Sequence, residues 1–125
     1  MNNKQHILIV DDDAGTVEIM SIILQNAGYE ISTDNNGDLL FLQTGIHPHL
    51  ILLDNKLGQK KGTDLCLELK AREETKYIPV VMVSASDDLK NLSANACADY
   101  FLSKPFSIQD LLAKVHTALY SKKTF

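Results

Sequence analysis

The chain has 125 residues, of which 45% are hydrophobic and 22% charged, which predicts one globular domain rather than a disordered chain. Its net charge of −4 and pI near 5.4 argue against direct binding of nucleic acid or of an anionic membrane, since those partners select clustered Lys and Arg. Its apolar runs are too short to span a bilayer, so we expect one cytoplasmic domain over residues 1–125, with its core at about 5–120 and no membrane insertion.

Five apolar runs along the chain have the length of β-strands. Several of them are apolar almost throughout, which suits strands that helices cover on both faces. Such strands are typical of a parallel sheet rather than of half-exposed hairpins. The runs are HILIV (6–10), YEIST (29–33), LILL (50–53), PVVMV (79–83) and DYFLS (99–103).

Helical patterns separate these runs. Apolar residues recur at helical spacing over 17–24, and Gly28 is placed to end that helix. Five β–α units in succession predict an α/β fold in which right-handed crossovers put helices on both faces of a parallel sheet. The other predicted helices cover residues 37–43, the residues after Gly62, a stretch with few apolar anchors at 86–96, and residues 108–119.

Polar side chains stand at the ends of four predicted strands. In an open parallel sheet the carboxyl ends of the strands meet at one edge, where ligands bind. Carboxylate oxygens at such an edge suit Mg²⁺ rather than zinc, and a cation would compensate the crowded negative charge. Asp13 lies closest to the helix start and is expected to cap that helix. The strand-end residues are Asp11, Asp12, Asp13, Asp54, Ser84 and Lys104.

Four motifs follow one another in a diagnostic order: ILIVDDD, LILLDNKLGQKKG, VVMVSAS and DYFLSKPF. With these motifs the chain resembles the receiver domain of two-component response regulators over essentially its whole length. The resemblance implies a flavodoxin-like (βα)5 three-layer sandwich, with a parallel five-stranded sheet of order 2-1-3-4-5. It also implies a phosphoprotein that works as a signalling switch in a phosphorelay, through reversible phosphorylation of one aspartate.

The resemblance assigns the acidic residues their roles position by position. Asp54 matches the phospho-acceptor, and Asp11 and Asp12 match the acidic pair of the family. Mg²⁺ is then expected to bind Asp11, Asp12, Asp54 and the backbone carbonyl of Lys56. Asp13 falls outside this set.

The resemblance also assigns a group of switch residues. Ser84 and Lys104 match the hydroxyl and the ammonium that contact the phosphoryl group, and Phe101 matches the aromatic switch position. Phe101 replaces the more usual Tyr, so any readout through that hydroxyl is absent. The peptide bond before Pro105 is typically cis in the family.

The partners implied by the resemblance are proteins. A sensor histidine kinase or a histidine phosphotransfer protein would donate the phosphoryl group, and an unidentified downstream protein would read the changed surface. The chain is expected to promote only its own phosphorylation and dephosphorylation, so it is not classed as an enzyme. It is read as a single-domain receiver of the chemotaxis type, with the N-terminal receiver of a larger regulator as an alternative.

Two features depart from the family pattern or stand outside it. Gly58 occupies the position where a Pro is usual, which frees φ and predicts a more mobile loop after the phosphorylation site. Cys66 and Cys97 lack the spacing of a zinc or redox motif. We therefore expect both cysteines to be buried, reduced thiols.

A rival interpretation is a phosphatase of the haloacid-dehalogenase type with Asp11 as nucleophile. DDDAGT nearly matches the D-x-D-x-T loop of that family, but Gly15 stands where the Thr belongs. Asp54 would have no role in that enzyme. A third possibility is a pseudo-receiver that only binds a partner. Against it argues the presence of the whole set Asp11, Asp12, Asp54, Ser84 and Lys104.

Overall fold

The computed structural model describes residues 4–38, 47–85 and 97–121 of the chain. Their central feature is a five-stranded sheet of order β2-β1-β3-β6-β7 in which every neighbouring pair is parallel. Counted along the chain, this is the predicted order 2-1-3-4-5. The strands are β1 (His6–Val10), β2 (Glu30–Asp34), β3 (Leu50–Asp54), β6 (Val80–Ala85) and β7 (Tyr100–Lys104).

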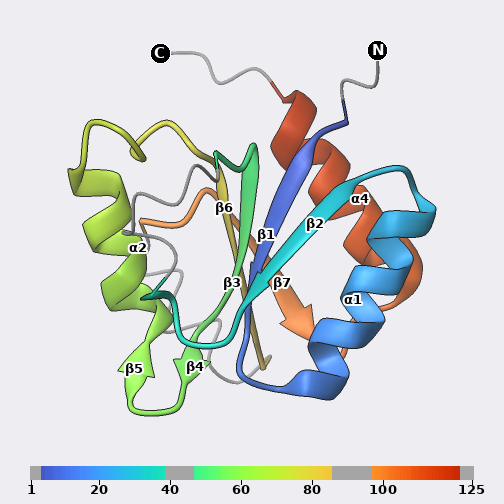
Figure 1. The fold of residues 1–125 in the computed structure, drawn as a ribbon, viewed down its shortest axis with the longest axis horizontal. Helices are drawn as coiled ribbons and strands as arrows, with labels where there is room; N and C mark the ends of the chain where they lie inside the picture. Colours follow the sequence, from blue (N-terminus) through green and yellow to red (C-terminus); the bar gives the residue numbers. More distant parts are fainter. Residues whose placement is uncertain (1–3, 39–46, 86–96, 122–125) are drawn as a thin grey trace.

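Helices cover both faces of this sheet, which confirms the three-layer α/β architecture (Figure 1). On one face lie α1 (Ala14–Asn26) and α4 (Ile108–Tyr120), and on the other lies α2 (Gly62–Ala71). The helices predicted over residues 37–43 and 86–96 fall wholly or largely outside the described residues. Gly28 follows the end of α1 with φ of 99°, in the left-handed region that ends helices.

The side chains of the strands alternate between two apolar cores. Ile7 and Ile9 of β1 face α1 and α4, where they meet Met20 and Leu111. Leu8 and its alternating partners on β3 and β6 face α2 and join its residues Cys66 and Leu69. Because both faces are buried, β1 and β3 read as continuous apolar runs in the sequence.

A short antiparallel hairpin was not predicted from the sequence. It consists of β4 (Lys56–Leu57) and β5 (Lys60–Lys61) and lies between β3 and α2 (Figure 1). Leu57 is buried in the same core as Leu8, so this one side chain anchors an otherwise exposed hairpin. The hairpin therefore has a fixed place next to the carboxyl end of β3.

Candidate functional site

Three carboxylates meet at the carboxyl edge of the sheet. Asp11 and Asp12 follow β1 directly and Asp54 is the last residue of β3, and these two strands are neighbours. One carboxylate oxygen from each residue lies within 4.8 Å of the others. Asp11 and Asp54 are buried, whereas Asp12 is exposed. The sequence prediction that these residues converge is borne out by the geometry.

Lys104 at the end of β7 supplies positive charge to the two buried carboxylates. Its Nζ lies 3.2 Å from Asp11 Oδ2 and 3.5 Å from Asp54 Oδ1. Although burial is the largest single influence on the pKa of Lys104 and lowers it, Asp11 and Asp54 together raise that pKa above its ordinary value. The lysine is therefore a fixed cation of the site. The peptide bond that follows it, to Pro105, is cis.

Backbone N–H groups neutralise part of the remaining negative charge. The N–H of Asp13 donates to Asp11 Oδ1 over 2.9 Å, and the N–H of Lys56 donates to the carboxylate of Asp54. These donors do not offset the unfavourable surroundings of Asp54. Burial and the charge of Asp11 raise the pKa of Asp54 to about 6. The site thus contains a carboxylate whose charge its surroundings disfavour.

Such an arrangement is suited to a hard cation. The donors are carboxylate oxygens, the ligand type that Mg²⁺ and Ca²⁺ prefer over zinc. A divalent cation among them would relieve the repulsion from Asp11 that, together with burial as the larger cause, raises the pKa of Asp54. The three aspartates could therefore hold a metal.

Ser84 and Phe101 lie on the neighbouring strands of the same half of the sheet. Ser84 is buried within β6, one residue beyond the register partner of Asp54, and not after the strand as predicted. Phe101 is half-buried on β7, opposite Met82, and packs against the core under α2. Ser84 therefore lies beside the acidic edge, and Phe101 lies on the next strand, two register positions away from the partner of Ser84.

Asp13 acts as a helix cap, as expected from its position. Its side chain accepts a hydrogen bond of 3.0 Å from the backbone N–H of Thr16 and another from the Thr16 hydroxyl. The bonds from Thr16 also hold the pKa of Asp13 below its ordinary value. The third aspartate of the DDD run therefore belongs to α1 and not to the acidic cluster.

Sequence reasoning missed one contact of the site. The backbone N–H of Gly58, in the hairpin, donates to Asp12 Oδ2 over 3.0 Å. The sequence predicted only that Gly58 makes the loop more mobile, whereas in the structure its N–H has a defined acceptor. The sequence contains one indication of this contact: Gly58 has a backbone N–H, and the Pro that is usual at this position has none.

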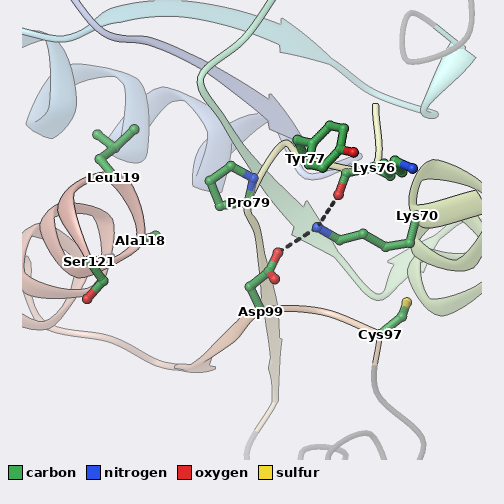
Figure 2. A pocket seen from close by; sticks show the side chains of 9 residues that line it. All are labelled: Lys70, Lys76, Tyr77, Pro79, Cys97, Asp99, Ala118, Leu119 and Ser121. Carbon is green, nitrogen blue, oxygen red and sulfur yellow. Dashed lines mark hydrogen bonds and ion pairs between the residues drawn. The ribbon is translucent and has the colours of Figure 1, made fainter. Parts of the chain in front are cut away.

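The amino end of the sheet holds a separate cavity of about 650 Å³ (Figure 2). Figure 2 shows the Lys70 ammonium between Asp99 and the chain at residues 76–79, and its Nζ lies 2.7 Å from Asp99 Oδ2. Cys97 also lines this cavity and is only half-buried, so the expectation of two buried thiols holds for Cys66 alone. The two thiols touch, and burial, followed by this contact, raises the pKa of Cys66. Neither Cys66 nor Cys97 forms a disulfide.

Comparison with known proteins decides the family of the chain. The model of the response regulator receiver domain matches residues 7–116. The chain belongs to the response regulator receiver family. The receiver is 34% identical over 119 residues to the DNA-binding response regulator MtrA of Mycobacterium tuberculosis, in an alignment that covers 93% of this chain and 51% of MtrA.

Solved structures agree with this assignment. A putative response regulator from Chloroflexus aurantiacus matches with a TM-score of 0.86 and 31% identity, over 94% of this receiver and 98% of that chain. The chemotaxis response regulator CheY4 of Vibrio cholerae matches with a TM-score of 0.82 and 26% identity, over 94% and 100% of the two chains. The receiver spans about half the length of the curated relatives it matches. Within its described residues, no helix is long and apolar enough to cross a membrane.

Proposed function

We propose that Asp54 of this receiver accepts a phosphoryl group from a phosphohistidine, with Mg²⁺ held by Asp11, Asp12, Asp54 and the backbone carbonyl of Lys56. The observation that carries the proposal is the meeting of three carboxylates and Lys104 at one sheet edge in a chain of the receiver family. An Asp54 oxygen forms a bond to phosphorus while the bond from phosphorus to the donor imidazole nitrogen breaks. A bound Mg²⁺ supplies positive charge to the phosphoryl oxygens during this transfer.

The protein groups of the site position the reactants and neutralise charge. Three aspartates carry −3 and Lys104 +1, so the site without metal has an excess of −2 that a divalent cation cancels. Phosphorylation replaces the carboxylate charge of −1 at Asp54 by about −2. That new charge draws the Lys104 ammonium and the Ser84 hydroxyl toward the phosphoryl oxygens. Displacement of the chain around Ser84 then gives the Phe101 ring a new position, which a downstream protein reads.

The proposed partners follow from this chemistry. A sensor histidine kinase or a histidine phosphotransfer protein is the donor, and the reaction takes place in the cytoplasm. The receiver promotes only its own phosphorylation and dephosphorylation. As a second candidate we propose the N-terminal receiver of a larger regulator, because relatives such as MtrA are called DNA-binding response regulators and are about twice as long as the matched region.

Mapping the phosphorylated residue tests the proposal. The receiver is incubated with radiolabelled acetyl phosphate and Mg²⁺, and the labelled aspartate is identified after reductive cleavage and mass spectrometry. Label is expected on Asp54, and Asp54→Asn is expected to abolish it, while the matched variant Asp13→Asn, which alters only the cap of α1, retains it. Label on Asp11 together with hydrolysis of phosphate esters would instead support the phosphatase interpretation.

A further inference from the structure

The turn of the β4–β5 hairpin favours a glycine at position 58. Two residues, Gly58 and Gln59, connect the strands, and Gly58 has φ of 64°. Glycine at the first position of a two-residue hairpin loop is typical of a type II′ turn. A proline, with φ fixed near −65°, cannot take this conformation, so the hairpin depends on the residue that departs from the family pattern.

This turn directs one backbone donor at the acidic cluster. The Gly58 N–H lies 3.0 Å from Asp12 Oδ2. Asp12 is the exposed member of the cluster, and an exposed carboxylate rotates freely unless a partner holds it. Only one of its two oxygens accepts from Gly58, which leaves Oδ1 able to bind a cation.

Three other residues of the hairpin hold it where Gly58 can reach Asp12. Leu57 is buried in the core under α2. Lys60 Nζ lies 2.8 Å from Asp38 Oδ1 and 3.3 Å from the backbone oxygen of Asn36, both in the loop after β2. The N–H of Lys56 is already engaged by Asp54. The hairpin is therefore fixed on both sides of the turn.

We infer that the backbone N–H of Gly58 is a positioning group for the metal site, which orients the Asp12 carboxylate so that its other oxygen faces the cation. Groups that hydrogen-bond to a metal ligand orient it, and their loss typically lowers metal affinity by about 10- to 100-fold. The inference rests on the proposed role of Asp12 as a Mg²⁺ ligand. On this inference the backbone N–H of residue 58 raises the Mg²⁺ affinity of the site, which a proline at this position cannot do because it has no N–H.

The hydrogen bond itself is tested in metal-free protein by NMR. Removing the acceptor with Asp12→Ala is expected to move the Gly58 amide proton upfield, because a hydrogen bond to a carboxylate shifts an amide proton downfield. Asp13→Ala removes a neighbouring carboxylate that bonds Thr16 instead, and it is expected to leave the Gly58 resonance in place. An amide proton that does not respond to Asp12→Ala would overturn the inference, whatever the metal does.

The effect on the metal is tested by calorimetric titration with MgCl₂. Gly58→Pro is expected to bind Mg²⁺ about tenfold more weakly than the wild type, whereas Gly58→Asn, which keeps the N–H and tolerates positive φ, is expected to bind within about twofold. Because Pro also breaks the turn, Gly58→Ala is the second variant: it keeps the N–H at a cost in strain and is expected to retain more affinity than Pro. Equal affinity of the wild type and Gly58→Pro would overturn the inference. Absence of Mg²⁺ binding by the wild type would instead count against the proposed function.

Discussion

Asp54 is a carboxylate whose surroundings oppose its charge. Burial and Asp11 raise its pKa from 3.8 to about 6, against the lowering influence of Lys104. Protonated Asp54 therefore favours the folded state, and this contribution is complete below pH 3.8 and is lost as the pH rises through about 6. The electrostatic strain in the metal-free site is thus largest at neutral pH, where the proposed phosphoryl transfer needs an ionised Asp54.

Asp54→Asn is expected to remove this pH dependence. In EDTA the wild type should lose stability between pH 4 and pH 7.5, whereas Asp54→Asn should not. The free energy of unfolding of the variant minus that of the wild type should therefore rise by about 1–2 kcal/mol, a value reduced from the full effect of the pKa shift because the site is partly exposed. Urea unfolding at both pH values measures it. Asp13→Asn provides the control: the pKa of Asp13 is lowered from 3.8, so its contribution is lost only as the pH falls below that value, and its stability difference should be nearly the same at both pH values. A stability difference for Asp54→Asn that is the same at both pH values would contradict the expectation.

Gly62 is a second residue whose identity the structure dictates. A Cβ at this position would lie 2.3 Å from the backbone oxygen of Asp54, far inside contact distance. Gly62→Ala is expected to lower the free energy of unfolding by about 2–3 kcal/mol, as overpacking does. Gly15→Ala is the matched control, because its Cβ would meet nothing nearer than 3.8 Å and Ala favours a helix; it should be neutral or stabilising. Thermal unfolding of both variants tests this expectation. Equal losses of stability for Gly62→Ala and Gly15→Ala would contradict the close approach of Gly62 to the backbone of Asp54.

The sequence predicted which side chains meet at the acidic edge, but not the backbone N–H groups that reach them. Asp11, Asp12, Asp54 and Lys104 were predicted together because the end of a parallel strand is visible as the end of an apolar run. The N–H groups of Lys56 and Gly58 that reach the carboxylates carry no residue-type signal. Their direction depends on turn geometry, which three-dimensional packing fixes.

At the scale of elements, the long apolar segments were predicted well and the short polar one was missed. The five strands agree with the predicted runs to within a residue or two at each end. The β4–β5 hairpin has two residues per strand and one buried side chain, Leu57, so it has no periodicity to detect. A segment held by a single apolar anchor and by long-range bonds such as Lys60 to Asp38 cannot be recognised from local pattern.

The ion pair between Lys70 of α2 and Asp99 ahead of β7 joins elements at the amino edge of the sheet (Figure 2). The Asp99 side chain is 8% exposed and also accepts from the backbone N–H of Val80. Burial lowers the pKa of Lys70, the cost of keeping this cation inside the protein. If one partner of this pair is removed, the other is left as an unpaired charge in surroundings that disfavour it.

Lys70→Met is expected to lower the free energy of unfolding by about 3 kcal/mol, because Asp99 loses the ammonium that neutralises it. Lys76→Met is the control. Its ion pair is with Glu73, whose side chain is 84% exposed, and an exposed pair contributes less than about 1 kcal/mol. Urea unfolding at pH 7 compares the two variants, and a loss for Lys70→Met no greater than that for Lys76→Met would show that the buried pair is not a stabilising link.

At the scale of the whole molecule, the two ends of the sheet carry different groups. The carboxyl end gathers the aspartates and Lys104, while the amino end is closed by the Lys70–Asp99 pair beside a cavity. The sheet order could be predicted because alternating strands and helices restrict the topologies and the motifs select one of them. The contact between the thiols of Cys66 and Cys97 could not, since nothing in their spacing of 31 positions predicts that α2 and the chain before β7 meet.

At the same scale, we expect a change at the acidic edge to reach Phe101. Ser84 and Phe101 lie on adjacent strands, and Phe101 is only half-buried against the core under α2, so its ring can change position without opening that core. Addition of Mg²⁺ and beryllofluoride, an acyl-phosphate mimic, is expected to shift the amide resonances of Ser84 and Phe101. The resonance of Lys70, at the opposite end of the sheet, should stay in place.

Asp54→Asn is the control for this NMR titration, because it removes the acceptor oxygen and should abolish every shift. Phe101→Leu tests the ring itself: resonances near Ser84 should still move on addition of beryllofluoride, while those of the neighbouring segment of β7 should move less than in the wild type. If the wild-type resonances of Asp54 shift and those of Ser84 and Phe101 do not, phosphorylation is not transmitted along this path. A partner of the proposed phosphorylated form would then have to recognise the acidic edge directly.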